Sequence, residues 1–349
     1  MSRSALYTYL PDGEPPAPWH GWTAQPSFGD PEAELDAALN GRACVDSSPS
    51  GRIEVSGRDR VDLLHRLSTN ALAHLQRGSA APTVFLTDKG RIIDRVLVCA
   101  TDETLLLLTS PGAEAFLTGW IGKYTITEDV TLREVTASTV MASLIGAEMI
   151  SGFCSGLGCP VPAAGEVSRC AALMLVRESP PDLLHVVAPA GEARALAEAV
   201  GRHAPGARWI GFRAYDAFRI AGGIPARPGE LSSAHNPLEC GLRPAVSFTK
   251  GCYIGQEVIA RLDTYSREKH ALAGLAFSRP PSGALPLSLT KNGAAAGTLT
   301  SVSSVPHHGA FAALGILRAD AAAAGDTLLA GEERAEARVT RYFPQGTRG

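Results

Sequence analysis

The stretch Lys250-Gly-Cys-Tyr-Ile-Gly-Gln-Glu257 is the most distinctive part of the sequence. Cys252 follows a glycine and precedes a segment, 255–262, whose pattern predicts a short helix. A nearby cation such as Lys250 and a helix N-terminus both favour the thiolate form of a cysteine, which is a nucleophile, a redox-active group or a metal ligand. On composition alone a more ordinary alternative stays open. In that alternative the stretch is a glycine-rich turn with a buried cysteine, a capping glutamate and a solvated lysine.

The residues before this stretch have a mixed helix and strand pattern. Residues 1–32 are rich in proline and turn formers, which predicts an irregular lead-in, and residues 151–168 resemble a long loop. Residues 212–221 have helical spacing and end at Gly222-Gly223, followed by Pro225. Strand-like patterns cover 83–86, 91–100, 104–109, 139–145, 171–176 and 183–188.

The residues after position 268 have a different texture. Turn-rich loops separate segments that have strand-like patterns. This arrangement predicts a small all-β domain that forms a barrel. The expected strands are 269–277, 296–305, 310–317 and 333–343.

Length and composition indicate a multidomain globular protein. The chain has 349 residues, with 45% hydrophobic and 19% charged residues and a formal net charge of -3. Large cores are therefore expected, and a chain-wide basic face for a nucleic acid is not. No apolar run approaches the roughly 18 residues that span a membrane, and the N-terminus lacks the features of a secretory or organelle signal. We expect a cytoplasmic protein without direct nucleic-acid or membrane binding.

The seven cysteines do not form a disulfide pattern, since their number is odd and their spacing irregular. Cys154 and Cys159 flank Ser-Gly-Leu-Gly, a spacing that suits a metal. However, no further ligand pattern lies nearby, so an ordinary loop is the first interpretation and no metal site is expected. His307-His308 more simply belongs to a polar turn. Trp19 and Trp22 either cover the mouth of a cavity or, as we favour, pack together as an aromatic plug against the first domain.

The motif at 250–257 resembles the hallmark K-G-C-[YF]-x-G-Q-E of the YgfZ family of folate-binding proteins. All six fixed positions match, and Arg219–Pro225 resembles the R-I-A-x-G-I-P run of the same family. The resemblance is sharp over 219–261 and fainter over 51–109.

The wider superfamily is that of the glycine-cleavage aminomethyltransferase, or T-protein. Pro237–Leu242 looks like its P-[LIV]-E-A-G-L segment, and Gly90–Arg95 looks like its G-G-I-x-D-D segment. Three of the differences from that enzyme bear on its chemistry. Cys252 replaces an aspartate, Arg95 replaces the second acid of the D-D pair, and Ala221 replaces an acid expected to grip the pterin. The lost acids argue against aminomethyl transfer while leaving folate binding open.

The resemblance implies an α+β fold of the T-protein type. It implies two intertwined α/β lobes and a C-terminal β-barrel around a central cavity that binds folate. We expect an N-terminal folate-binding lobe over 1–140, a second lobe carrying the cysteine motif over 141–265, and the barrel over 266–349.

The resemblance also implies a function. The expected protein binds tetrahydrofolate and assists the assembly or repair of iron–sulfur clusters in client enzymes, with client or assembly proteins as partners. Cys252 and Lys250 are the expected catalytic pair. Residues expected to bind the folate are Asp94, Arg219, Glu239, Tyr253, Gln256 and Glu257.

Alternatives remain for single residues and for the whole chain. For Asp94 the alternative is a solvated strand face, for Arg219 a surface salt bridge in place of a clamp on the folate tail, and for Glu239 a structural hydrogen bond. For the whole chain, the alternatives are a folate-dependent one-carbon transferase and an interaction module that no longer binds folate.

Overall fold

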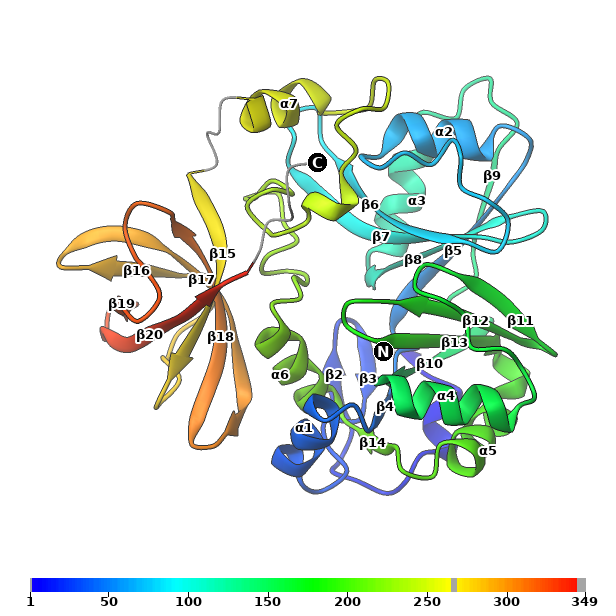
Figure 1. Cartoon of the computed structure of the whole chain (residues 1–349), viewed down its shortest axis with the longest axis horizontal. Helices are drawn as coiled ribbons and strands as arrows, with labels where there is room; N and C mark the ends of the chain where they lie inside the picture. The colour runs from blue at the N-terminus through cyan, green and yellow to red at the C-terminus, as the bar shows by residue number, and fades with distance from the viewer. Residues whose placement is uncertain (1, 265–268, 344–349) are drawn as a thin grey trace. The chain divides into compact units, whose positions relative to one another are not determined.

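The computed structural model describes residues 2–264 and 269–343 (Figure 1). The chain divides into two compact units, each assembled from three segments. Unit 1 comprises Met1–Leu64, Leu72–Ala81 and Val96–Tyr215, and unit 2 comprises His65–Ala71, Pro82–Arg95 and Asp216–Gly349. The expected three-part division at 140/141 and 265/266 stays a prediction. No helix of the described residues is both long and apolar enough to cross a membrane.

The helices are short. They are η1 (Leu6–Tyr9), α1 (Pro31–Leu39), α2 (Arg60–Leu67), α3 (Glu114–Gly122), α4 (Ala147–Gly156), η2 (Ala190–Glu192), α5 (Ala193–His203), α6 (Phe212–Gly222), η3 (Arg243–Ala245) and α7 (Gln256–Thr264). The predicted helices at 212–221 and 255–262 correspond to α6 and α7, each within two residues at either end.

Unit 1 contains a six-stranded mixed sheet of order β11-β12-β13-β10-β4-β14. Its strands are β4 (Ala43–Asp46), β10 (Thr139–Ile145), β11 (Val167–Cys170), β12 (Leu173–Glu178), β13 (Leu183–Pro189) and β14 (Arg208–Ile210). A five-stranded sheet has the order β6-β7-β8-β5-β9. Its strands are β5 (Ser50–Ser56), β6 (Ala80–Leu86), β7 (Ile92–Ala100), β8 (Leu105–Pro111) and β9 (Thr131–Glu134).

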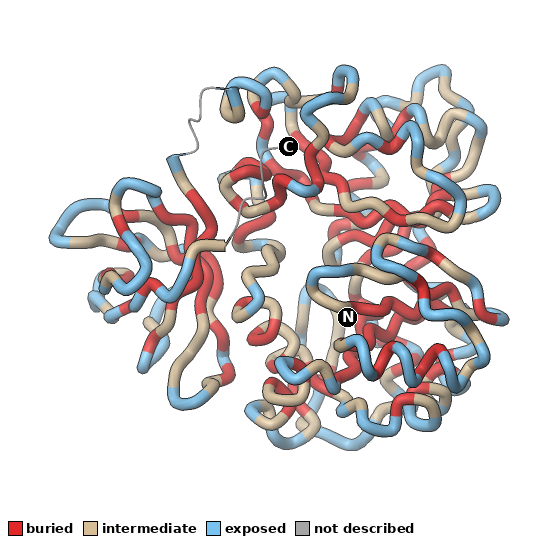
Figure 2. Tube along the Cα trace, viewed as in Figure 1, coloured by how far each residue is buried: buried red, intermediate tan, exposed pale blue. Residues whose placement is uncertain are grey.

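Alternate side chains of β10 pack into two different apolar clusters of unit 1. Val140, Ala142 and Leu144 share one apolar cluster with residues of α4 and α5. Met141, between them in sequence, belongs to a second cluster with residues of β7 and β8. Successive side chains of a strand point to opposite faces, so one face of the six-stranded sheet is covered by helices and the other by the second sheet. Figure 2 shows the resulting buried strands.

The irregular lead-in expected over 1–32 is wrong in part. It contains a small sheet of β1 (Ser2–Arg3), β2 (Ala17–Trp19) and β3 (Trp22–Ala24) in the order β1-β3-β2. β2 and β3 form a hairpin in which Trp19 pairs with Trp22. The two turn residues, His20 and Gly21, both have positive φ, of 46° and 82°. This is the geometry of a tight hairpin turn, which Asn-Gly signals more clearly than His-Gly.

Trp19 stacks on Phe212, with ring centroids 5.7 Å apart and planes 10° from parallel. The same two rings line a small cavity of unit 1 together with Gln25 and Asp46. Trp19 thus combines both expected roles, as a packed aromatic and as part of a cavity wall.

The long loop expected over 151–168 is also wrong in part, because α4 extends to Gly156. Phe153 and Cys154 follow Met149 and Ile150 at helical spacing, and all four are buried. The glycine and serine content of the segment obscured this pattern.

The structure contains a disulfide that the cysteine spacing did not predict. Cys159, just after α4, is bonded to Cys170 at the end of β11. The other five cysteines are free, and of these only Cys252 is exposed. Cys159 is therefore one half of a cross-link between the end of α4 and β11.

The C-terminal barrel is confirmed. Six strands close in the order β15-β18-β17-β16-β19-β20 (Figure 1). They are β15 (His270–Phe277), β16 (Leu287–Lys291), β17 (Ala294–His307), β18 (Ala310–Arg318), β19 (Thr327–Ala330) and β20 (Ala335–Tyr342). Four of them match the predicted segments, whereas the short strands β16 and β19 were not predicted. Buried alanines such as Ala273, Ala313 and Ala337 leave room for the larger side chains that fill so narrow a barrel.

Breaking the Cys159–Cys170 bond should destabilise unit 1. The bond closes a short loop, and the loss of such a cross-link costs about 2–3 kcal/mol through the entropy of the unfolded chain. Urea unfolding of the wild-type protein with and without a dithiol reductant measures the effect. A Cys170→Ser variant is the control and should not respond to the reductant. Equal stability of the oxidised and reduced wild type would contradict the assignment.

Candidate functional site

The predicted cysteine motif forms a loop of unit 2 that leads into α7. Cys252 is exposed, whereas its neighbour Tyr253 is buried in an apolar cluster that includes Ile92, Leu238 and Ile259. The loop therefore has its aromatic residue anchored in the core and its thiol at the surface. The alternative of a buried cysteine at this position is wrong.

Only one of the two motif glycines is conformationally required. Gly255 has φ of 82°, and a Cβ there would lie 2.7 Å from the carbonyl oxygen of Thr87 and 3.1 Å from Cα of Gly90. The turn into α7 is thus pressed against the β6–β7 turn, and only glycine fits. At Gly251 a Cβ would meet no atom within 4 Å.

Lys250 directs its ammonium group to backbone carbonyls. Nζ donates to the carbonyl oxygens of His65, of Ser68 at 2.6 Å and of Asn70 at 2.9 Å. It also lies 5.0 Å from the centroid of the Tyr253 ring. Burial lowers the pKa of Lys250 to about 8, so the group is still mainly an ammonium at pH 7. Its predicted support of the Cys252 thiolate stays a prediction.

Residues of η3 and α7 also hold the loop in place. Gln256 Nε2 donates to the carbonyl oxygens of Lys250 and Gly251, each at 3.4 Å. Arg243, in the preceding η3 turn, pairs with Asp263 of α7 at 2.5 Å and stacks over the ring of Phe248 at 4.5 Å. These contacts bind the loop to both the residues before it and the helix after it.

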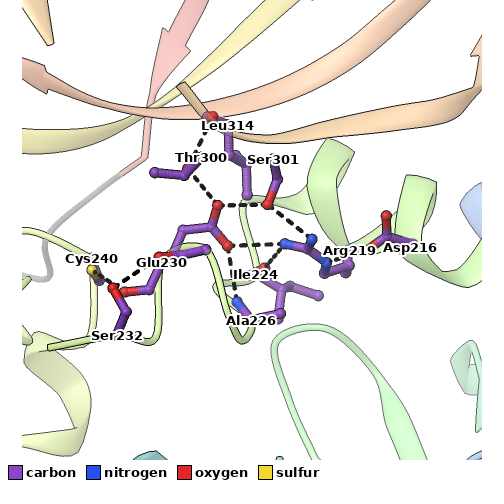
Figure 3. Close-up of polar contacts among 11 residues, drawn as sticks. Asp216, Arg219, Ile224, Ala226, Glu230, Ser232, Cys240, Thr300, Ser301 and Leu314 are labelled. Atoms are coloured by element: carbon purple, nitrogen blue, oxygen red, sulfur yellow. Dashed lines mark hydrogen bonds and ion pairs between the residues drawn. The ribbon is translucent and has the colours of Figure 1, made fainter. Parts of the chain in front are cut away.

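Arg219 lies in a buried ion-pair network (Figure 3). Its Nε donates to Asp216 at 2.7 Å, and its two Nη atoms donate to Glu230 at 3.0 Å and to Ser301 at 3.0 Å. A longer bond of 3.4 Å reaches the carbonyl oxygen of Ile224. Burial opposes its charged form, but Asp216 and Glu230 outweigh burial and raise the pKa of Arg219. Arg219 thus forms salt bridges, but they are buried ones, unlike the surface salt bridge considered as the alternative.

Glu230, at the centre of this network, is fully buried and was not predicted. One carboxylate oxygen accepts from Thr300 at 2.5 Å and Ser301 at 2.7 Å, and the other accepts from Arg219 and from the backbone N–H of Ala226, each at 3.0 Å. A single acid in the turn-rich segment 226–235 carries no sequence signal, and its hydroxyl partners, Thr300 and Ser301, lie some seventy residues away.

Glu239 belongs to a second polar cluster. It accepts from the backbone N–H of Asn236 at 3.0 Å, while Asn236 Oδ1 accepts from the N–H of Glu239 at 3.1 Å, a reciprocal cap. Glu239 also lies 3.5 Å from His270 and 4.0 Å from Arg91. Nearby, burial lowers the pKa of His235. Glu239 thus makes the structural hydrogen bond considered for it, and its other oxygen faces His270.

The last two candidates differ in exposure. Asp94 is fully buried on β7, beside Ile93, whose carbonyl oxygen accepts from Arg227 at 2.5 Å. The solvated strand face considered for Asp94 is therefore wrong. Glu257 is 88% exposed on the first turn of α7 and pairs with Arg261 at 3.1 Å. The structure thus brings Lys250, Cys252 and Tyr253 together in one loop, with Gln256 next to them as the first residue of α7. Asp94, Arg219, Glu239 and Glu257 do not belong to this loop.

The two motif glycines provide a matched test of this geometry. Gly255→Ala should lower the free energy of unfolding by roughly 2 kcal/mol or more, because it forces a positive φ on alanine and a clash with a carbonyl. Gly251→Ala should change it by less than about 0.5 kcal/mol. Urea unfolding of both variants measures the difference. Equal effects would contradict the described turn.

Comparison with known proteins identifies the family. Residues 9–150 match the family described as the GCVT N-terminal domain. A protein of Arabidopsis thaliana named "Putative transferase At1g60990, chloroplastic" is 32% identical over 317 residues, which cover 88% of this chain and 72% of the relative. The aminomethyltransferase of Geobacillus kaustophilus is 28% identical over 278 residues, 75% of each chain.

A solved structure shows the same fold. The glycine cleavage system aminomethyltransferase T from Bartonella henselae superimposes with a TM-score of 0.84 and 20% identity, over 99% of this chain and 98% of that one. The predicted T-protein fold is therefore confirmed. Together with the relatives, this shows that the chain belongs to the aminomethyltransferase superfamily characterised by the GCVT domain.

Proposed function

We propose that this protein is a tetrahydrofolate-binding accessory factor for the assembly or repair of iron–sulfur clusters in client enzymes. In this proposal it belongs to the YgfZ branch of the superfamily and acts in the cytoplasm. The observation that carries the proposal is the exposed thiol of Cys252 on a loop that is anchored on both sides. An aminomethyltransferase has no evident need for such a thiol.

The state of the other free cysteines supports a special role for Cys252. Cys44, Cys99, Cys154 and Cys240 are buried, and burial raises the pKa of each of these thiols. They are therefore poor nucleophiles and poor ligands at neutral pH. The cargo at Cys252 would be a sulfur, iron or one-carbon species. A single thiol cannot hold a cluster, so a client or assembly protein has to supply the other ligands.

The fit of the described residues to tetrahydrofolate is partial. Arg219 makes four hydrogen bonds within the protein, which does not suit a clamp on the folate tail. Glu239 is 15% exposed and suits an acceptor for a pterin N–H group. Tyr253, Gln256, Glu257 and Asp94 remain proposed contacts. When bound, tetrahydrofolate supplies a carrier for one-carbon units.

The proposal is tested in two steps. Anaerobic calorimetric titration with tetrahydrofolate should give saturable binding of equal affinity for wild type and Cys252→Ser, since the thiol is not among the proposed folate contacts. In cells lacking the protein, Cys252→Ser should fail to restore the activity of iron–sulfur enzymes, whereas Cys99→Ala, a buried control, should restore it. Absence of folate binding, or full rescue by Cys252→Ser, would each refute its part of the proposal.

A second candidate function is a folate-dependent one-carbon transferase, which the names of several relatives favour. It requires turnover of an aminomethyl or N-methyl donor, and dependence of that turnover on the Asp94 carboxylate. A tetrahydrofolate-dependent assay of wild type and Asp94→Asn distinguishes the two functions. Turnover that falls at least about 100-fold in Asp94→Asn, as expected for loss of a catalytic acid or base, would favour the transferase. Absence of turnover by wild type would exclude it.

A further inference from the structure

The three acceptors of Lys250 lie at the end of a helix. His65 is in the last turn of α2, Ser68 follows the last helical residue, and Asn70 lies two residues further along the chain. Carbonyls at a helix C-terminus lack partners within the helix and form the negative end of its dipole. An ammonium group has three N–H donors, and here all three have a carbonyl acceptor. The side chain of Lys250 thus caps α2 from another part of the chain.

The same two segments are joined by further hydrogen bonds. The backbone N–H of Ser247 donates to the carbonyl oxygen of Thr69 at 2.9 Å, and the Thr69 hydroxyl donates to the carbonyl oxygen of Ala245 at 2.6 Å. The N–H of Lys250 itself donates to the Ser247 hydroxyl at 3.2 Å. Residues 245–250 therefore lie along residues 65–70, and we call this pair of hydrogen-bonded segments the seam. The ammonium of Lys250 makes the contacts of the seam that lie nearest to Cys252 in the sequence.

We propose that Lys250 is a positioning residue for Cys252, which fixes the cysteine loop to the C-terminal end of α2 through its three carbonyl contacts. It acts through the geometry of the loop, and neither through its charge on the thiol nor as a proton donor. The inference rests on the proposed function only in taking Cys252 as the reactive group.

Substitution of Lys250 by arginine distinguishes a role of its hydrogen-bond geometry from a role of its charge. Lys250→Arg keeps the positive charge, but a planar guanidinium cannot present three donors to carbonyls that converge on one nitrogen. Lys250→Met removes the charge and keeps most of the apolar stem. If Lys250 acts by position, both variants lose the seam alike. If it acts by charge, arginine substitutes for lysine.

The first measurement is hydrogen exchange of the backbone amides of Ser247, Lys250 and Gln256 in the full chain. Both variants should exchange at least about 10-fold faster than wild type, the effect expected from losing contacts worth a hydrogen bond or more. Wild-type exchange in Lys250→Arg would overturn the proposal. Gln256→Leu loosens the loop from its other side while keeping Lys250. It should raise exchange at the same amides, which makes it the positive control for a loosened loop; if Lys250→Met does not fold, Lys250→Arg alone decides the measurement.

The second measurement is alkylation of Cys252 by iodoacetamide, which is neutral, and iodoacetate, which is an anion. A cation acting on the thiol changes the ratio of the two rates, whereas a positioning residue does not. The ratio should stay within about 2-fold of wild type in Lys250→Met, since the ammonium is directed at the carbonyls. A ratio changed by about 5-fold or more would overturn the proposal. Neither measurement depends on folate or client enzymes, so failure here is distinct from failure of the proposed function.

Discussion

The buried carboxylate of Glu230 holds together parts of unit 2 that are distant in sequence. It accepts hydrogen bonds from Arg219 of α6, from Thr300 and Ser301 of β17, and from the backbone of Ala226. Breaking a buried pair of this kind costs about 3–5 kcal/mol, because the remaining charge stays buried without compensation. Such a network adds little net stability over an apolar core, but it admits few arrangements that satisfy every member. Leu231, which follows Glu230 directly, belongs to the same apolar cluster as Tyr253 of the cysteine loop.

Three buried or half-buried cations of the chain are stabilised in three different ways. Arg219 is paired with carboxylates, and its charge is favoured. Arg52 of β5, in unit 1, is fully buried and donates to hydroxyl and carbonyl oxygens, and burial lowers its pKa to about 10. Lys250 is intermediate, since it donates to carbonyls alone but is only partly buried. Neutral oxygens accept hydrogen bonds only at suitable distances and angles. Arg52 and Lys250 therefore stabilise the fold by holding these acceptors in fixed positions.

Local patterns predicted elements better than they predicted partners. The long barrel strands, α6 and α7 follow from alternation and helical spacing in the sequence, whereas β16 and β19 are too short to stand out. The motif correctly placed Cys252 before a helix. It did not reveal that Lys250 reaches residues 65–70, because that contact joins segments some 180 positions apart. The Cys159–Cys170 pair was missed for a related reason, since it depends on where α4 ends relative to β11.

The distribution of the cysteines limits the stoichiometry of any sulfur chemistry. Two of the seven are bonded to each other, four are buried and one is exposed. One reachable thiol per chain can carry one sulfur atom or supply one bond to iron. It has no neighbouring thiol at the surface with which to close a second disulfide within the molecule. Oxidation of Cys252 to a disulfide therefore has to consume one thiol of another molecule. With a second copy of this chain, or with a small monothiol, the product is a one-to-one adduct, which cannot grow into a polymer through disulfides.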